Sequence, residues 1–189
     1  MKENKKALRL LFIGNSHTYY NDLPLLVRDR AEAEGIPAEV TMLAHGGWYL
    51  YQHLREPETL FNVAHGRYDY VILQEHSHPF DKTEEYLRAA RELSLLIREA
   101  GAKPVIYATW AEKAHPENQE RMDRVNREIA KENGALLAAV GEAWQKAGGS
   151  GAPPAFYGPD GAHASPAGSG FAAGIIWETV RGDLVKEKA

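Results

Sequence analysis

The side chains with the clearest potential for chemistry are a serine near the start of the chain and an aspartate and a histidine near its end. Ser16 follows Gly14 and Asn15, and Asp160 precedes His163 by three residues. At that spacing a carboxylate can hold the Nδ1 proton of an imidazole while Nε2 faces outward. An imidazole placed in this way activates a serine hydroxyl by accepting its proton. Together the three residues indicate acyl transfer by a serine nucleophile.

Each of these residues taken alone has a simpler interpretation. Gly-Asn-Ser is a common loop composition, so Ser16 alone suggests a turn or helix-capping serine. Asp160 opens an Asp-Gly turn signal, and His163 alone suggests a surface histidine. Their joint occurrence in one chain favours the catalytic interpretation.

The composition disfavours several other classes of function. The chain has no Cys, so it offers no disulfide framework, thiolate metal site or cysteine nucleophile. Its 22 Lys and Arg against 26 Asp and Glu give a net charge of -4, without a basic patch dense enough to follow phosphates. We therefore expect no nucleic-acid partner.

The histidines raise a metal site as an alternative. His17, His45, His76, His78 and His163 all lie in polar segments. However, matched carboxylates and a spacing such as His-Glu-x-x-His are missing from the sequence. We therefore expect no metal and no other cofactor.

The hydrophobic pattern predicts a parallel α/β sheet that brings these residues together. Apolar runs alternate with stretches of helical period, which is typical of βαβ units with helices on both faces. We expect strands at residues 8–13, 39–43, 70–73, 105–109 and 136–140, and helices around residues 23–31, 86–100, 122–129 and 171–180. The 189 residues predict one three-layer α/β/α domain over residues 1–189, with a five-stranded parallel sheet in the flavodoxin-like order 2-1-3-4-5.

Two segments outside this pattern have their own interpretation. Residues 147–154 contain three glycines and two prolines and are expected to form a surface loop. Residues 1–16 superficially resemble a secretory signal, but Arg9 interrupts an apolar run that is too short for one. No apolar run approaches the roughly 20 residues that cross a bilayer, so we expect no membrane partner and a cytoplasmic location.

Ligands of open parallel sheets bind outside the carboxyl ends of the strands. Residues 14–18, 44–47 and 74–78 follow the first three predicted strands, and residues 160–163 precede the last helix. In this order the four segments resemble the motifs of the SGNH or GDSL-like serine hydrolase superfamily, in a branch that opens with Gly-Asn-Ser. The resemblance spans most of the chain.

The resemblance implies a role for individual residues. Ser16 matches the nucleophile, and Asp160 and His163 match the other two members of its triad. The backbone N–H groups of Ser16 and Gly47 would form the oxyanion hole, with Gly46 as the alternative to Gly47.

Two positions depart from the family pattern. The third motif usually supplies an Asn to the oxyanion, whereas this chain has Gln74 followed by Glu75. The longer amide of Gln74 is expected to donate in its place, an arrangement similar to the branches that include sugar O-acetylesterases. The proline that often follows the catalytic histidine is displaced to Pro166, which leaves the chemistry intact.

The expected function is that of a serine esterase that cleaves small acyl esters, acetyl above all, with carbohydrate as the leading substrate class. Side chains expected to contact substrate are His17, Trp48, Tyr49, His76 and Trp110, with packing as the alternative for the aromatic ones. The alternatives are a lipase or thioesterase-type hydrolase and a non-catalytic sugar- or acyl-binding module on the same fold. The sequence predicts a small-molecule or carbohydrate ester as partner and no particular oligomeric state.

Overall fold

Five parallel strands form the centre of the computed structural model, which describes residues 6–148 and 155–187. Their order is β2-β1-β3-β4-β5, as the sequence predicts. The strands are β1 (Leu8–Gly14), β2 (Ala38–Ala44), β3 (Tyr70–Leu73), β4 (Lys103–Tyr107) and β5 (Leu136–Ala138). Most of the predicted loop at residues 147–154 lies outside the described residues.

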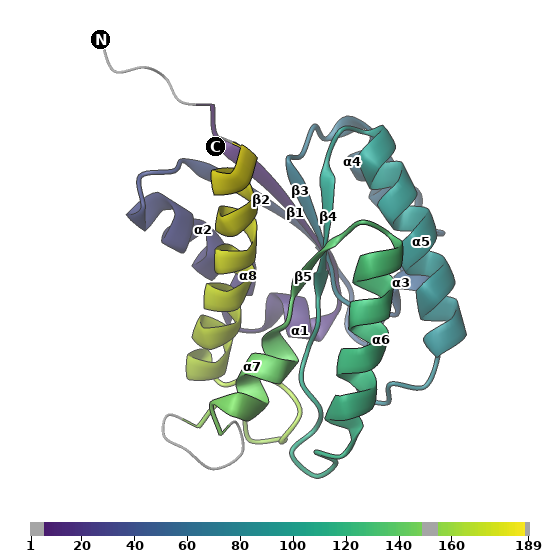
Figure 1. Ribbon diagram of the computed structural model, residues 1–189, viewed down its shortest axis with the longest axis vertical. Helices are drawn as coiled ribbons and strands as arrows, with labels where there is room; N and C mark the ends of the chain where they lie inside the picture. The colour runs from purple at the N-terminus through teal and green to yellow at the C-terminus, as the bar shows by residue number, and fades with distance from the viewer. Residues whose placement is uncertain (1–5, 149–154, 188–189) are drawn as a thin grey trace.

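Helices cover both faces of this sheet, so the predicted three layers are confirmed (Figure 1). One face carries α2 (Leu23–Ala33), α7 (Val140–Lys146) and α8 (Pro166–Glu187). The other carries α3 (Leu50–His53), α4 (Pro57–His65), α5 (Thr83–Glu99) and α6 (Asn118–Glu132). A short helix α1 (Ser16–Tyr19) and a 3-10 turn (Tyr20–Asp22) follow β1 at the carboxyl edge of the sheet.

Strand β1 explains why the sheet needs two covering layers. Side chains alternate between the faces of a strand, and those of Leu10 and Phe12 enter the core beneath α2 and α8. Leu11 and Ile13 enter the opposite core beneath α5. All four are fully buried, so β1 is a central strand with no solvent-facing side over this stretch.

The fourth and fifth strands differ from the prediction at their ends. Strand β4 begins at Lys103 and ends at Tyr107, two residues earlier than expected, and Val140 belongs to α7 rather than to β5. The apolar run after Tyr107 is a buried loop, in which Thr109 and Trp110 are shielded from solvent. Burial alone does not distinguish a buried strand from a buried loop.

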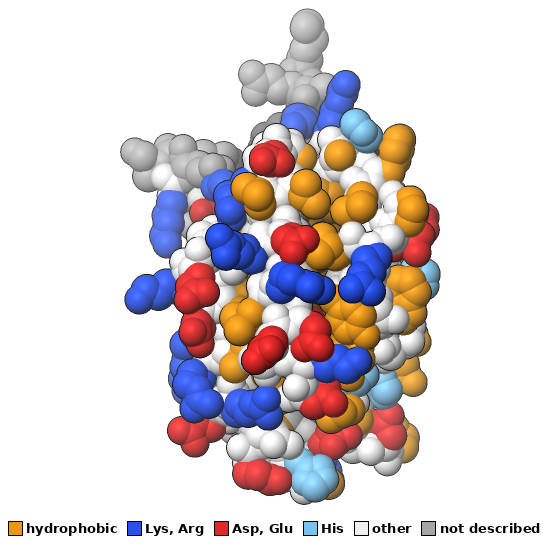
Figure 2. Space-filling view, turned by 90° about the vertical axis from the view of Figure 1, so that its right-hand side faces the viewer, with side chains coloured by type: hydrophobic (Ala, Val, Ile, Leu, Met, Phe, Trp, Pro, Cys, Tyr) orange, Lys and Arg blue, Asp and Glu red, His pale blue; other side chains and the backbone are white. Residues whose placement is uncertain are grey.

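The outer face of the α4–α6 layer carries acidic and basic side chains side by side, together with exposed apolar ones (Figure 2). Helix α5 buries Tyr86, Leu93 and Ile97 against the sheet and ends two residues before Gly101, close to the predicted end. Across the described ranges, no helix has both the length and the apolar character needed to cross a bilayer.

Candidate active site

Ser16, His163 and Asp160 come from opposite ends of the chain and form a continuous hydrogen-bonded chain. Ser16 begins α1 just beyond β1, and its Oγ lies 2.8 Å from His163 Nε2. His163 Nδ1 lies 2.6 Å from Asp160 Oδ2. Because a carboxylate accepts at this position, Nδ1 carries the proton and Nε2 is left to accept one. This geometry suits deprotonation of Ser16 by His163.

The loop around Asp160 fixes its carboxylate in the ionised state. Asp160 Oδ1 accepts hydrogen bonds at 3.0 Å from the backbone N–H groups of Ala162 and His163. The hydrogen bond from the His163 ring, followed by that from Ala162, lowers the pKa of Asp160 to about 2. The carboxylate is therefore negative at neutral pH and orients the imidazole.

The loop after β4 holds the Asp160–His163 loop from beneath. Trp110 Nε1–H donates to the carbonyl of Ala162 at 2.8 Å, and the Lys113 N–H donates to the carbonyl of Gly161 at 2.8 Å. Trp110 is fully buried and stacks on Trp144 with ring centroids 3.9 Å apart. These contacts fit packing, the alternative that the sequence analysis gave for the aromatic side chains. Its indole supports the loop that carries His163.

Two further rings lie parallel to the imidazole of His163. The ring of Tyr20 is 4.1 Å away at an interplanar angle of 10°, and the ring of His17 is 4.9 Å away at 23°. Both residues belong to the same short segment as Ser16, so the segment that carries Ser16 also packs against His163.

His17 and His78 form a neutral histidine pair beside the base. Their ring centroids are 5.1 Å apart. Burial lowers the pKa of His17 well below its ordinary range, and burial also lowers the pKa of His78 to about 4. Over the described part of the chain, no three side chains of His, Asp or Glu converge in a way that could hold a metal ion.

The turn that presents Ser16 requires glycine at its start. A Cβ atom on Gly14 would lie 2.4 Å from Thr18 Oγ1 and 2.6 Å from Gln74 Oε1, closer than real Cβ contacts allow. His53, which is buried, places its Nε2 2.8 Å from the carbonyl oxygen of Gly14. The backbone before Ser16 thus lies between the buried polar side chains of His53 and Gln74.

Gln74 occupies a different environment from the one expected for an oxyanion donor. Its Oε1 accepts from the Asn15 N–H and from Thr18 Oγ1, both at 2.9 Å, and its Nε2 donates to the carbonyl of Glu75. The side chain is fully buried. These contacts favour support of the turn that presents Ser16 over donation to an oxyanion.

The glycine turn after β2 lies beside the nucleophile turn. Asn15 Nδ2 donates to the carbonyl of Trp48 at 2.9 Å, which ties the two turns together. Gly47 is exposed and has a φ of +73°, a conformation that side chains with a Cβ rarely adopt. The backbone here can therefore approach a ligand closely without a side chain in the way.

The remaining predicted contact residues are only partly buried. Trp48 packs on His45 with ring centroids 4.0 Å apart, and Tyr49 stacks on His76 at 4.2 Å. The Tyr49 hydroxyl donates to Asp81 at 3.2 Å. Trp48, Tyr49 and His76 thus join the loops after β2 and β3 next to the glycine turn.

Glu75 is a site residue for which the sequence analysis predicted no role. Its carboxylate accepts from the Leu50 N–H at 3.1 Å and from the His76 N–H at 2.8 Å. Burial raises its pKa to about 8. The only sequence signal for Glu75 was an ionisable residue directly after Gln74, at the end of the apolar run of the third strand. These two hydrogen bonds join the start of α3 to the loop after β3.

No protein-family profile and no curated protein sequence matches the chain. Among solved structures, a protein from Slackia heliotrinireducens assigned to the SGNH hydrolases is 33% identical, with a TM-score of 0.78 over 93% of this chain and 100% of that one. An acetylxylan esterase from Geobacillus stearothermophilus is 18% identical, with a TM-score of 0.71 over 93% and 96%. A carbohydrate esterase of family 3 from Talaromyces cellulolyticus is 15% identical, with a TM-score of 0.73 over 95% and 99%. At the two lower identities the likeness concerns the fold.

Proposed function

The chain belongs to the SGNH hydrolase family, and from this premise we propose that it is a serine esterase that removes small acyl groups, acetyl above all, from alcohols. A carboxylic ester hydrolase needs a nucleophile, a base and a site for the oxyanion. The observation that carries the proposal is the contact of 2.8 Å between Ser16 Oγ and His163 Nε2, extended by the 2.6 Å contact from His163 Nδ1 to Asp160.

Acylation would begin when Ser16 Oγ attacks the ester carbonyl carbon while His163 Nε2 accepts the hydroxyl proton. The tetrahedral intermediate then collapses: the bond to the alcohol oxygen breaks, and His163 donates the proton to that oxygen. The alcohol leaves, and the acyl group stays on Ser16. Water, deprotonated by His163, attacks the acyl-enzyme, releases the carboxylic acid and restores Ser16.

Asp160 contributes by stabilising the charge that forms on His163. The carboxylate remains ionised at neutral pH, because its hydrogen bonds lower its pKa to about 2. It therefore favours the imidazolium in both transition states without itself taking the proton.

The oxyanion would be met by the backbone N–H groups of Ser16 and Gly47. Asn15 holds their two turns together through its hydrogen bond to Trp48. Loss of a single oxyanion donor typically costs about 2.7 to 4 kcal/mol in transition-state stabilisation. We assign Gln74 to the support of the first turn, because both polar atoms of its amide contact protein groups.

Hydrolysis of p-nitrophenyl acetate by the purified protein tests this function. We expect saturable turnover by the wild type and a loss of at least about 10³ in kcat for Ser16→Ala. Circular dichroism of the variant checks that the fold is kept. A Ser16→Ala protein that retains more than about a tenth of the wild-type kcat would remove Ser16 as the nucleophile.

A further inference from the structure

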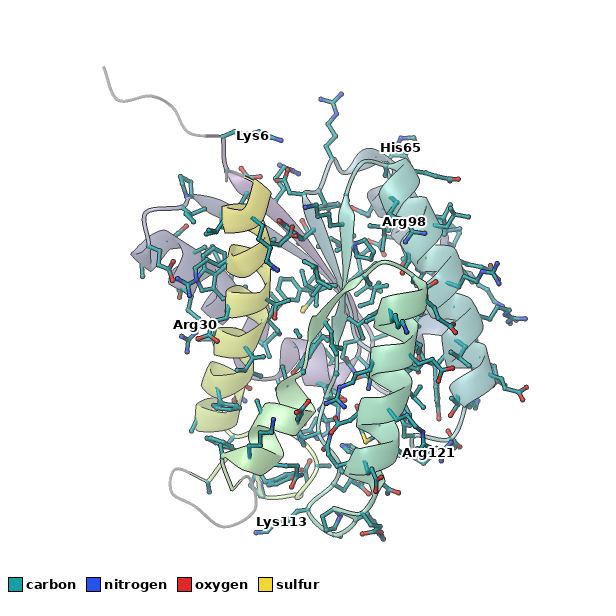
Figure 3. The ribbon with its side chains drawn as sticks, viewed as in Figure 1. Lys6, Arg30, His65, Arg98, Lys113 and Arg121 are labelled. Carbon is teal, nitrogen blue, oxygen red and sulfur yellow. The ribbon has the colours of Figure 1, made fainter. Side chains whose placement is uncertain are left out.

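A groove of about 440 Å³ lies between the loops after β3 and β4, outside the triad. Its walls come from residues 77–81 on one side and from residues 112–121 on the other. Both segments follow parallel strands at the carboxyl edge where Ser16 lies. In Figure 3, Lys113 and Arg121 mark this end of the molecule, opposite Lys6.

Two histidine rings connect this groove to His163. His78 lines it, and the His78 ring contacts His17, which in turn stacks on His163. The hydrogen bond from the Lys113 N–H to the Gly161 carbonyl joins one wall to the loop of His163. The groove therefore lies on the side of His163 that carries His17 and His78, two ring contacts away from the imidazole that must protonate a leaving alcohol.

The lining combines an aromatic ring with several hydrogen-bonding groups. The ring of Phe80 lies in the wall, and the guanidinium of Arg121 lies 5.9 Å from its centroid. Asp81, Glu112 and Asn118 supply acceptors, and Arg121 and Asn118 supply donors. The aromatic face suits the C–H surface of a sugar ring, and the polar groups suit its hydroxyls, which both donate and accept.

Glu112 is available for such a ligand. It is half-buried, and among the residues that the structure describes its carboxylate has no hydrogen bond or ion pair. With Asp81 it gives the groove two carboxylates, and the other titratable side chains of the lining are the guanidinium of Arg121 and the imidazoles of His78 and His115. This excess of negative charge disfavours alcohols that bear a carboxylate or phosphate.

We propose that this groove binds the alcohol part of the substrate, a neutral polyhydroxylated ring such as a pyranoside, and that Glu112 and Arg121 determine this specificity. The inference rests on the proposed esterase function, because the groove serves that reaction only if His163 protonates the leaving alcohol. The acyl group would then lie on the other side, near Gly47.

The test compares two acetyl esters that differ in their alcohol. One is p-nitrophenyl acetate, whose flat leaving group has no hydroxyl besides the esterified one. The other is a mono-O-acetylated methyl glycoside, whose remaining hydroxyls can bind in the groove. We expect Glu112→Gln and Arg121→Gln each to lower kcat/KM for the glycoside by about tenfold or more, mainly through KM. Both variants should stay within about twofold of wild type on p-nitrophenyl acetate.

Matched controls lie outside the groove on α6, the helix that carries Arg121. Glu120→Gln and Arg124→Gln remove the same charges from exposed positions of α6 and should leave both esters unaffected. The deacetylated methyl glycoside should also inhibit hydrolysis of p-nitrophenyl acetate competitively, and Glu112→Gln should weaken that inhibition. This second readout does not depend on turnover of the sugar ester.

The proposal is overturned if both groove variants keep wild-type kcat/KM on the glycoside or lose it equally on both esters. It is also overturned if the wild type hydrolyses p-nitrophenyl acetate but leaves the acetylated glycoside intact. In these cases the esterase function stands. If the wild type hydrolyses neither ester, the proposed function fails and this inference fails with it.

Discussion

Gln74 Oε1 accepts a hydrogen bond from the N–H of Asn15, the residue directly before Ser16, at 2.9 Å. The end of β3 is thereby joined to the turn that ends β1 and presents Ser16. The position of the Ser16 hydroxyl thus depends on a buried amide from the neighbouring strand.

Replacing Gln74 by Ala should therefore reduce stability more than catalysis. The change leaves the Asn15 N–H and the Thr18 hydroxyl without their buried acceptor, which costs about 1–3 kcal/mol and on the order of 5 °C in Tm. We expect a loss in kcat of less than about tenfold. Thr18→Val removes one of the two bonds and should lower Tm by less.

Thermal melts and acetyl ester kinetics of these variants separate the two roles of Gln74. A fall in kcat of about 10² to 10³ with an unchanged Tm would instead identify its amide as an oxyanion donor. In that case Gln74→Asn should recover part of the activity, as its shorter amide keeps the donor.

The base and its carboxylate should act as a unit with the nucleophile. His163→Ala should lower kcat by at least about 10³, and Asp160→Asn should lower it by about 10³ to 10⁴, because the amide no longer fixes the proton on Nδ1. Steady-state kinetics with circular dichroism as the folding control measure this. Near-wild-type activity in Asp160→Asn would show that the 2.6 Å contact does not serve catalysis.

Acetyl esters should be better substrates than octanoyl esters. Trp48 and Tyr49 follow Gly47 directly and are fixed by stacking on His45 and His76, which crowds the side where the acyl group would lie. A series of p-nitrophenyl esters from two to eight carbons gives kcat/KM for each length. A maximum at eight carbons would favour the lipase alternative and leave the mechanism unchanged.

The buried carboxyl of Glu75 predicts a pH dependence of stability. Burial raises its pKa in the folded protein to about 8 from an ordinary value of 4.5. Between these two values the unfolded chain has lost a proton that the folded protein retains, so this residue lowers the free energy of unfolding as the pH rises. Its destabilising effect is fully present above about pH 8.

Glu75→Gln should remove this dependence. On going from pH 5 to pH 8, the Tm of the wild type should fall relative to that of the variant. Taking the difference between the two proteins cancels the other titrating groups, including His17 and His78. The same difference in Tm at both pH values would show that Glu75 does not titrate in this range.

The sheet could be predicted because its strands carry their own signal. The run from Leu10 to Ile13 is apolar on both faces, and such a strand needs cover on both sides. The Asp160 and His163 pair was recognisable because its two members are close in sequence and belong to one turn. Short helices such as α3, with four residues, leave no comparable periodicity.

The side-chain environments could not be predicted in the same way. Trp110 and Gln74 both follow strands at the carboxyl edge. The sequence alone does not indicate whether either side chain is buried or contacts a ligand. Whether such a side chain faces a ligand or the core depends on the loops that cover it. Here Trp144 covers Trp110, and Thr18 and Asn15 cover Gln74.

Labelling with a fluorophosphonate probe tests the central claim most directly, since this reagent reacts with an activated serine. Mass spectrometry of the intact protein and of its peptides should find one adduct, on Ser16. Neither Ser16→Ala nor heat-denatured wild type should be labelled, and His163→Ala should be labelled far more slowly. Absence of an adduct on the folded wild type, or an adduct that persists in Ser16→Ala, would contradict the assignment of Ser16 as the nucleophile.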